Sequence, residues 1–251
     1  MERHARDEFV SELTSYYTFL THVFLPPSAI RHPPPGGWAH ITPSFVDSYG
    51  LGKDAAVTDL MRHIPYIRRD EADGDHPWII YEKTAAVDYA GEVILGRRNK
   101  RGVEHLVEPE VEEMFCGMPP AHVYVLATHT GGRDGHFVFV DTRRAVVVVA
   151  DWQVGPRSTE LSLSDDSDEF YWYKYATYTF GDFFSMLKDH FRDFKVVSGH
   201  RTITRVATTR RKVQFGRSAP DHVVKIYQEE GICTERYDRE RCMDWLDNYC
   251  E

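Results

Sequence analysis

The clearest β-strand signal is HVYVLATHTGGRDGHFVFVDTRRAVVVVADW, which occupies residues 122–152. Two runs rich in valine and aromatic residues, 122–128 and 136–141, flank the glycine-rich linker 131–135, and this pattern predicts a β-hairpin. The run 145–152 contains four consecutive valines and predicts a third strand that is apolar on both faces. We expect this meander, buried by helices, to form the centre of the fold.

Helical patterns lie on both sides of the meander. Apolar residues recur at helical spacing before it, where Pro26 and Pro27 end the first pattern, and again after it. The segments expected to be helical are 5–25, 54–64, 180–194, 218–231 and 238–249. The segments expected to be strands outside the meander are 78–81, 86–89 and a pair within 195–215. This order predicts an α+β fold, with a central, mainly antiparallel sheet packed by N- and C-terminal helices.

Length and composition bound the domain organisation and the class of protein. The 251 residues fit a single α+β catalytic domain spanning 1–251, with the N-terminal helix and proline-rich loop, about 1–38, as an extension. Hydrophobic residues make up 42% of the chain, which is enough for a large core and excludes wholesale disorder. No apolar run approaches the roughly 20 residues of a membrane span, so we expect no membrane partner.

The cysteines and the N-terminus indicate the cellular compartment. The 4 cysteines form no Cys-x-x-Cys pair, and their spacing fits neither a zinc site nor a disulfide framework. The charged N-terminus lacks the apolar core of a secretory signal. A reduced, cytoplasmic protein without a metal or another cofactor is therefore expected. His122, His129 and His136 surround the hairpin, but their spacing favours ordinary turn and strand histidines over a metal cluster.

Charge is unevenly distributed along the chain. The formal net charge of −9 argues against indiscriminate nucleic-acid binding. Between Asp193 and Asp221, however, there is no acidic residue. The basic residues that we expect to contact tRNA in this strip are Arg201, Arg205, Arg210, Arg211 and Lys212. A pair of solvated strands facing acidic residues elsewhere in the fold accounts for the strip equally well.

A dense group of carboxylates lies at 165–169, directly before the aromatic run 170–173. Like charges packed this closely raise at least one carboxyl pKa unless a cation lies among them. A divalent metal, a guanidinium and a substrate ammonium all fit such a cluster. The alternative is a solvated acidic loop, because charge blocks are usually exposed.

The acidic group carries a family resemblance. Asp165, Asp166 and Glu169 match the Asp-Asp-x-x-Glu motif of the fungal arginine-containing cyclodipeptide synthases, which this chain also resembles in length. The segments 59–67 and 151–156 resemble those of a broader group of fungal proteins, and that similarity covers about residues 37–245. The resemblance implies a transferase of secondary metabolism, with Asp165, Asp166 and Glu169 as its catalytic residues.

The resemblance also implies the substrates. The family condenses arginyl-tRNA with a second aminoacyl-tRNA to a cyclic dipeptide, a diketopiperazine. Aminoacyl esters are already activated, and the sequence has no P-loop or other nucleotide-binding signature, which agrees with pre-charged tRNA as the substrate. Guanidinium matches paired carboxylates, so one acid of the motif could hold arginine while another takes a proton from the α-amine.

Several alternatives stay open at the level of sequence. Ser162, Ser164 and Ser167 lie beside the acids and could carry a covalent aminoacyl group. The meander followed by 178–187 resembles the SUKH superfamily, which implies a non-enzymatic, protein-binding regulatory module whose acidic run is an adaptor surface. The Asp-Asp-x-x-Glu pattern is also similar to the metal motif of terpene synthases, but the valine-rich meander argues against their all-helical fold.

Overall fold

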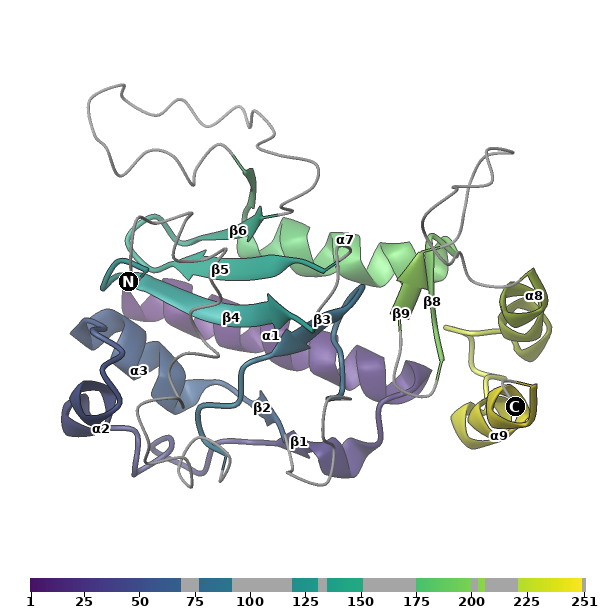
Figure 1. The fold of residues 1–251 in the computed structure, drawn as a ribbon, viewed down its shortest axis with the longest axis horizontal. Coiled ribbons are helices and arrows are strands. Elements are labelled where there is room, and N and C mark those ends of the chain that lie inside the picture. The colour runs from purple at the N-terminus through teal and green to yellow at the C-terminus, as the bar shows by residue number, and fades with distance from the viewer. Residues whose placement is uncertain are drawn as a thin grey trace.

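The structure is a computed structural model that describes residues 1–68, 77–91, 119–130, 135–150, 175–199, 203–205 and 221–249 (Figure 1). Its helices and strands combine into an α+β fold, as the sequence predicts. The helices are α1 (Arg3–Val23), α2 (Pro43–Ser48), α3 (Ala55–His63), α7 (Phe180–Arg192), α8 (Asp221–Glu230) and α9 (Arg239–Tyr249), with a 3-10 turn at Pro27–Ala29. No helix within these described ranges is long and apolar enough to cross a membrane.

A five-stranded antiparallel sheet forms the centre of the molecule. Its strands follow one another in the spatial order β3-β4-β5-β6-β7. Their bounds are β3 (Thr84–Ala86), β4 (Val123–His129), β5 (Phe137–Asp141), β6 (Val146–Ala150) and β7 (Ala176–Tyr178). Nearly every residue of β4, β5 and β6 is buried, because apolar side chains occupy both faces of these strands. The predicted hairpin and third strand are thus confirmed.

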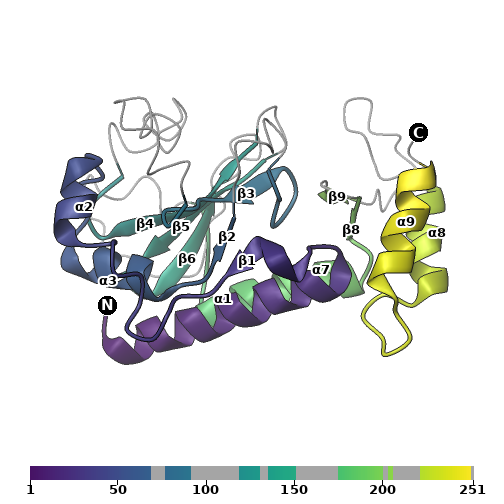
Figure 2. The same cartoon turned by 90° about the horizontal axis from the view of Figure 1, so that it is seen from below.

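Helices α1 and α7 lie side by side against one face of this sheet, as Figure 2 shows. Phe9 near the start of α1 meets Phe180 at the start of α7, with ring centroids 5.0 Å apart. Phe19 and Phe191 meet near the other ends of the two helices at 5.8 Å. The helices are therefore parallel, and the apolar face predicted for each one is buried in the core.

Two short strand pairs lie outside the central sheet. The strands β1 (Ile30–Arg31) and β2 (Tyr66–Ile67) pair with each other, and so do β8 (Val196–Ser198) and β9 (Ile203–Arg205). The second pair confirms the strand pair expected within 195–215. Helices α8 and α9 contact each other beyond β8, at the C-terminal side of the molecule (Figure 1).

Side-chain hydrogen bonds cap the N-termini of two helices. Thr179 and Asp54 accept hydrogen bonds from N–H groups in the first turns of α7 and α3, respectively.

The segment 78–81, expected to be a strand, is irregular apart from a single bridge between Tyr81 and Thr84. The chain reverses at once after Tyr81, and Lys83 adopts a left-handed φ of 41° in that turn. Of the expected strand 86–89, only Ala86 belongs to a strand, as the last residue of β3, and residues 87–89 are irregular.

Candidate functional site

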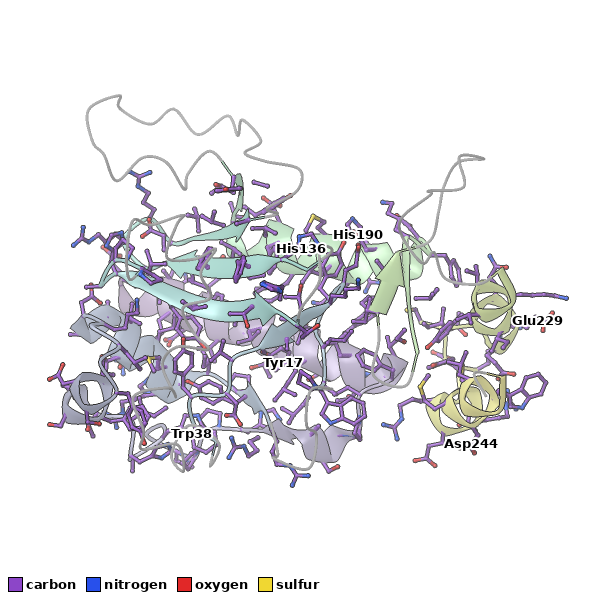
Figure 3. All side chains as sticks on the ribbon, in the orientation of Figure 1. Tyr17, Trp38, His136, His190, Glu229 and Asp244 are labelled. Atoms are coloured by element: carbon purple, nitrogen blue, oxygen red, sulfur yellow. The ribbon has the colours of Figure 1, made fainter. Side chains whose placement is uncertain are left out.

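The two ends of the central sheet carry different side chains. One end, called the histidine end here, is formed by Thr84, His129, Phe137, Ala150 and Ala176. The strand register brings these five residues to the same end, because Thr84 pairs with His129, Phe137 with Ala150, and Val149 with Ala176. Helix α7 runs along the sheet so that its last turn, with His190, also reaches this end (Figure 3).

A tyrosine and a histidine from distant parts of the chain are hydrogen bonded at the histidine end. The hydroxyl of Tyr81 lies 2.7 Å from Nδ1 of His190, although 109 positions separate the two residues. Tyr81 is 8% exposed and His190 is intermediate between buried and exposed. The pair therefore joins the turn before β3 to the last turn of α7, and solvent reaches it from the histidine.

A second histidine packs against the same tyrosine. The ring of His136 lies 5.4 Å from that of Tyr81, centroid to centroid, and is 8% exposed. The backbone N–H of His136 donates to the hydroxyl of Thr84 at 3.0 Å. Tyr81 thus contacts His136, which directly precedes β5, and His190 on α7, and Figure 3 shows the two histidines close to each other.

The turn that presents Tyr81 is fixed by backbone contacts. The hydroxyl of Thr84 donates to the carbonyl of Glu82, and both the N–H and the hydroxyl of Thr130 donate to the carbonyl of Lys83. Gly135 is required beside this turn, because a Cβ there would lie 2.2 Å from the Cβ of His129. The position of Tyr81 is therefore set by the sheet and not by a freely moving loop.

The chemistry available at the histidine end is proton transfer. An imidazole changes its charge near neutral pH, and a phenol can both donate and accept a hydrogen bond. The described groups that gather here are Tyr81, Glu82, Lys83, His129, His136 and His190. Of these, Glu82 is buried at 8% exposure, while Lys83 is exposed. Such a set can accept a proton from an amine and return it to a leaving oxygen.

A second polar cluster lies inside the fold, between β1 and the residues that follow β3. Nη2 of Arg31 lies 2.6 Å from both carboxylate oxygens of Asp88, whose side chain is 3% exposed. The guanidinium also stands 5.8 Å from the centre of the Trp38 ring. Burial raises the pKa of Tyr17, and the Asp88 carboxylate adds to that rise. This cluster is a closed ion pair among aromatic rings, and it ties the two segments together.

The predicted catalytic residues Asp165, Asp166 and Glu169 lie outside the described residues. Residues 151–174, which contain them, connect Ala150 of β6 to Tyr175, directly before β7. Both attachment points belong to the histidine end, since Val149 pairs with Ala176. The assignment of the three acids to a catalytic site stays a prediction.

The predicted tRNA-binding residues Arg201, Arg210, Arg211 and Lys212 also lie outside the described residues. Arg205 is described as the last residue of β9, where its backbone pairs with Val196 of β8. Within the described part of the strip, Lys195 forms an ion pair with Asp193 at 3.0 Å. The tRNA-binding role of the strip therefore stays a prediction.

The hairpin histidines do not form a metal cluster. Among the described residues, which include His122, His129 and His136, no three histidine, cysteine, aspartate or glutamate side chains gather closely enough to hold a metal ion. The strand register explains this result. His122 precedes β4 and His129 ends it, so the two histidines lie at opposite ends of the sheet.

Sequence reasoning missed the pairing of Tyr81 with His190. One signal was available: His190 follows Leu187 by three positions and Phe183 by seven, which puts an imidazole at the border of the apolar face of α7. Tyr81 had no comparable signal, because its role depends on a contact across 109 positions.

Comparison of the chain with protein-family models, with curated proteins and with solved structures gave no match.

Proposed function

We propose that this chain is an arginine-containing cyclodipeptide synthase, which condenses arginyl-tRNA with a second aminoacyl-tRNA to a cyclo(Arg-Xaa) diketopiperazine in secondary metabolism. The proposal starts from the Asp-Asp-x-x-Glu motif formed by Asp165, Asp166 and Glu169. The observation that carries it further is that the stretch with this motif joins β6 to β7 at the histidine end. The groups suited to proton transfer, Tyr81, His136 and His190, belong to the same end.

The reaction needs few components, and the chain offers a group for each. The aminoacyl ester is already activated, so the protein has to hold the α-amine near the ester carbonyl and supply a proton acceptor. Ring closure also requires a cis amide, which costs about 2.5 to 4 kcal/mol for an ordinary residue. A site that binds the folded-over dipeptide would offset that cost. Carboxylates for the guanidinium and the basic strip for the tRNA complete the proposed set.

Mass spectrometry of a reconstituted reaction tests the proposal. The purified chain is incubated with tRNA, arginyl-tRNA synthetase, a mixed synthetase fraction, ATP and all amino acids, including labelled arginine. We expect a cyclic dipeptide that contains the label and disappears after RNase treatment. We also expect Asp166→Asn to abolish the product without lowering the unfolding temperature.

A matched variant controls for the loss of a carboxylate. Asp47 is an exposed residue of α2, which lies at the other side of the molecule from the histidine end (Figure 1), so Asp47→Asn should leave product formation unchanged. Absence of product from well-folded wild-type protein, with charged tRNA confirmed in the mixture, would overturn the proposed synthase activity.

One observation favours a second candidate, a SUKH-like protein-binding module. The strands β4 to β7 form an uninterrupted meander in space, and α7 follows β7 after one residue. In this case, the purified chain makes no cyclic dipeptide, and Asp166→Asn only mildly weakens partner binding. The reconstituted reaction therefore separates the two candidates.

A further inference from the structure

We propose that the proline loop, residues 32–38, is a docking surface for a protein domain whose aromatic-lined groove binds polyproline II segments. The loop has the sequence His-Pro-Pro-Pro-Gly-Gly-Trp and follows β1 directly, on the way to α2. This inference goes beyond the proposed synthase activity and does not depend on it, because the loop carries none of the residues assigned to that reaction.

The covalent chemistry of proline restricts the backbone in the first half of the loop. A proline ring fixes its own φ at about −65° and keeps the residue before it out of the helical region. His32, Pro33 and Pro34 each precede a proline, so all three are restricted to extended backbone. Three such residues make about one turn of a polyproline II helix.

A tight turn ends this extended stretch. The N–H of Gly37 donates to the carbonyl of Pro34 at 2.8 Å, and Gly36 has a φ of 88°. A proline followed by a residue with positive φ is typical of a type II turn, and glycine adopts that φ without strain. The prolines 33–35, called the proline ridge here, thus lie between β1 and a defined turn.

Contacts at both ends hold the proline ridge in place. Before it, Arg31 belongs to β1 and forms the ion pair with a buried aspartate described above. After it, Trp38 donates from its backbone N–H to the carbonyl of Arg62 at 2.9 Å and from Nε1 to that of Ile64 at 3.0 Å. A Cβ on Gly37 would lie 2.6 Å from the Arg62 oxygen, so the loop lies directly on the end of α3. The ridge is therefore ordered before a partner binds, which lowers the entropic cost of binding.

The proline ridge faces solvent, whereas the residues that anchor the loop do not. Pro34, Pro35 and Gly36 are exposed, while Gly37 is buried and Trp38 is intermediate. None of the residues after His32 in the loop has a charged side chain, so an apolar groove can cover the ridge without burying a charge. Stiff, exposed prolines are the feature that aromatic-lined grooves bind in polyproline II segments.

The proline ridge lies away from the histidine end. Figure 3 labels Trp38 near the lower edge of the molecule, and His136 and His190 on the other side of the central sheet's strands in that view. A domain bound to the ridge would leave the histidine end open. We therefore expect the partner to locate or recruit the protein and not to take part in proton transfer.

Nuclear magnetic resonance of the isotope-labelled full-length protein tests the proposal. Purified SH3, WW and EVH1 domains, which bind polyproline II segments through aromatic-lined grooves, are the probes. We expect one of these classes to shift the backbone amide signals of His32 and Gly36 and the indole signal of Trp38. The same domain with one aromatic side chain of its groove replaced by alanine should cause no shift.

Two proline substitutions and a matched control locate the contact. Pro34→Ala and Pro35→Ala should each lower the affinity for that domain by about 10-fold, because each removes part of the ridge. Pro27→Ala removes an exposed proline from the 3-10 turn Pro27–Ala29, outside the loop, and should leave the affinity unchanged. Thermal unfolding of all three variants verifies that the fold is intact.

The outcomes keep this inference apart from the proposed synthase activity. Shifts limited to the loop, and weakened in Pro34→Ala and Pro35→Ala, would support docking whether or not the chain makes a cyclic dipeptide. No shift with any of the three domain classes at millimolar concentration would overturn the inference, and so would binding that both substitutions leave unchanged. Shifts of the same signals by a single-stranded RNA oligonucleotide, without shifts by any domain, would assign the loop to nucleic-acid binding and overturn it as well.

Discussion

The two ends of the central sheet use buried polar groups in opposite ways. At the histidine end, side chains that can transfer protons gather around Tyr81. At the other end, called the turn end here and formed by Val123, Asp141 and Val146, polar side chains bond to the backbone. Asp141 is fully buried and accepts hydrogen bonds from the N–H groups of Arg143 and Arg144 at 2.8 and 3.1 Å.

Further backbone contacts close the turn end. Nζ of Lys53 donates to the carbonyls of Pro119 and Pro120 at 2.9 and 3.3 Å, and the N–H of Asp54 donates to the carbonyl of Ala121. These contacts dock the start of α3 onto the segment that directly precedes β4. This difference between the two ends indicates that the polar groups of the turn end stabilise the fold, whereas the histidine end keeps side chains suited to proton transfer. Substitutions at the two ends should therefore separate stability from activity.

The largest effect on stability is expected from Asp141→Ala at the turn end. The substitution removes two charge-assisted hydrogen bonds from the turn, so the free energy of unfolding should fall by about 3 kcal/mol. Urea denaturation measures this change, with Asp47→Ala on exposed α2 as a control that should stay within about 0.5 kcal/mol. A loss below about 1 kcal/mol for Asp141→Ala would mean that the turn end is not the stabilising one.

A pH effect is expected next, also at the turn end. Burial lowers the pKa of Lys53 to about 8, although the neighbouring Asp54 opposes this shift. In the unfolded chain, a lysine pKa is near 10.4, so between these values the unfolded state binds more protons and stability rises with pH. Relative to Lys53→Met, the wild type should gain about 2 kcal/mol of unfolding free energy between pH 7.5 and 9.5.

The comparison with Lys53→Met cancels the titration of all other groups. Urea denaturation of both proteins at the two pH values gives the difference. A constant difference between pH 7.5 and 9.5 would show that Lys53 keeps an ordinary pKa and that its burial has little energetic consequence.

A smaller loss of stability is expected from Thr84→Val at the histidine end. The hydroxyl of Thr84 is buried, accepts from the N–H of His136 at 3.0 Å and donates to the carbonyl of Glu82 at 2.7 Å. Valine keeps the shape but leaves both groups unsatisfied, at a cost of about 1.5 kcal/mol. Thr21→Val on α1 is the matched control, because the hydroxyl of Thr21 donates to the carbonyl of Thr18 in an exposed hydrogen bond. A similar loss of stability in that variant would show that the loss in Thr84→Val does not come from the burial of the Thr84 contacts.

The smallest effect on stability is expected from Tyr81→Phe. The ring still packs against His136, and the lost hydroxyl bonded a histidine that is partly exposed to solvent, so the loss should be about 0.5 to 1 kcal/mol. Thermal unfolding of the variant measures it. A loss above about 2 kcal/mol would contradict the contrast between the ends, because the histidine end would then also be a main source of stability.

Much of the fold could be predicted because its signals are local. The valine-rich runs gave β4, β5 and β6, and helical spacing gave α1, α3 and α7. The short elements α2, β1, β2 and β7 were missed, because a helix of six residues or a strand of two or three has too little pattern to detect. The segment ending at Tyr81 has the composition of a strand, but the turn at Lys83 prevents it from forming one.

The candidate site was less predictable for a physical reason. An acidic motif such as Asp165, Asp166 and Glu169 is visible in sequence because its members are neighbours. The Tyr81–His190 pair depends on the register of the sheet and on the direction of α7, and neither is encoded near Tyr81. Long-range pairs of this kind become visible only when the elements that carry them are placed in space.

The parallel contact of α1 with α7 has a consequence for synthesis of the chain. Phe9 finds its partner Phe180 only after roughly 170 further residues have been made, which takes about 10 to 35 s at ordinary translation rates. During that time, the apolar face of α1, including Leu13 and Leu20, has no partner helix on the ribosome. Helix α1 is thus made long before the helix against which it packs, and the nascent chain presents an exposed apolar segment that chaperones can bind.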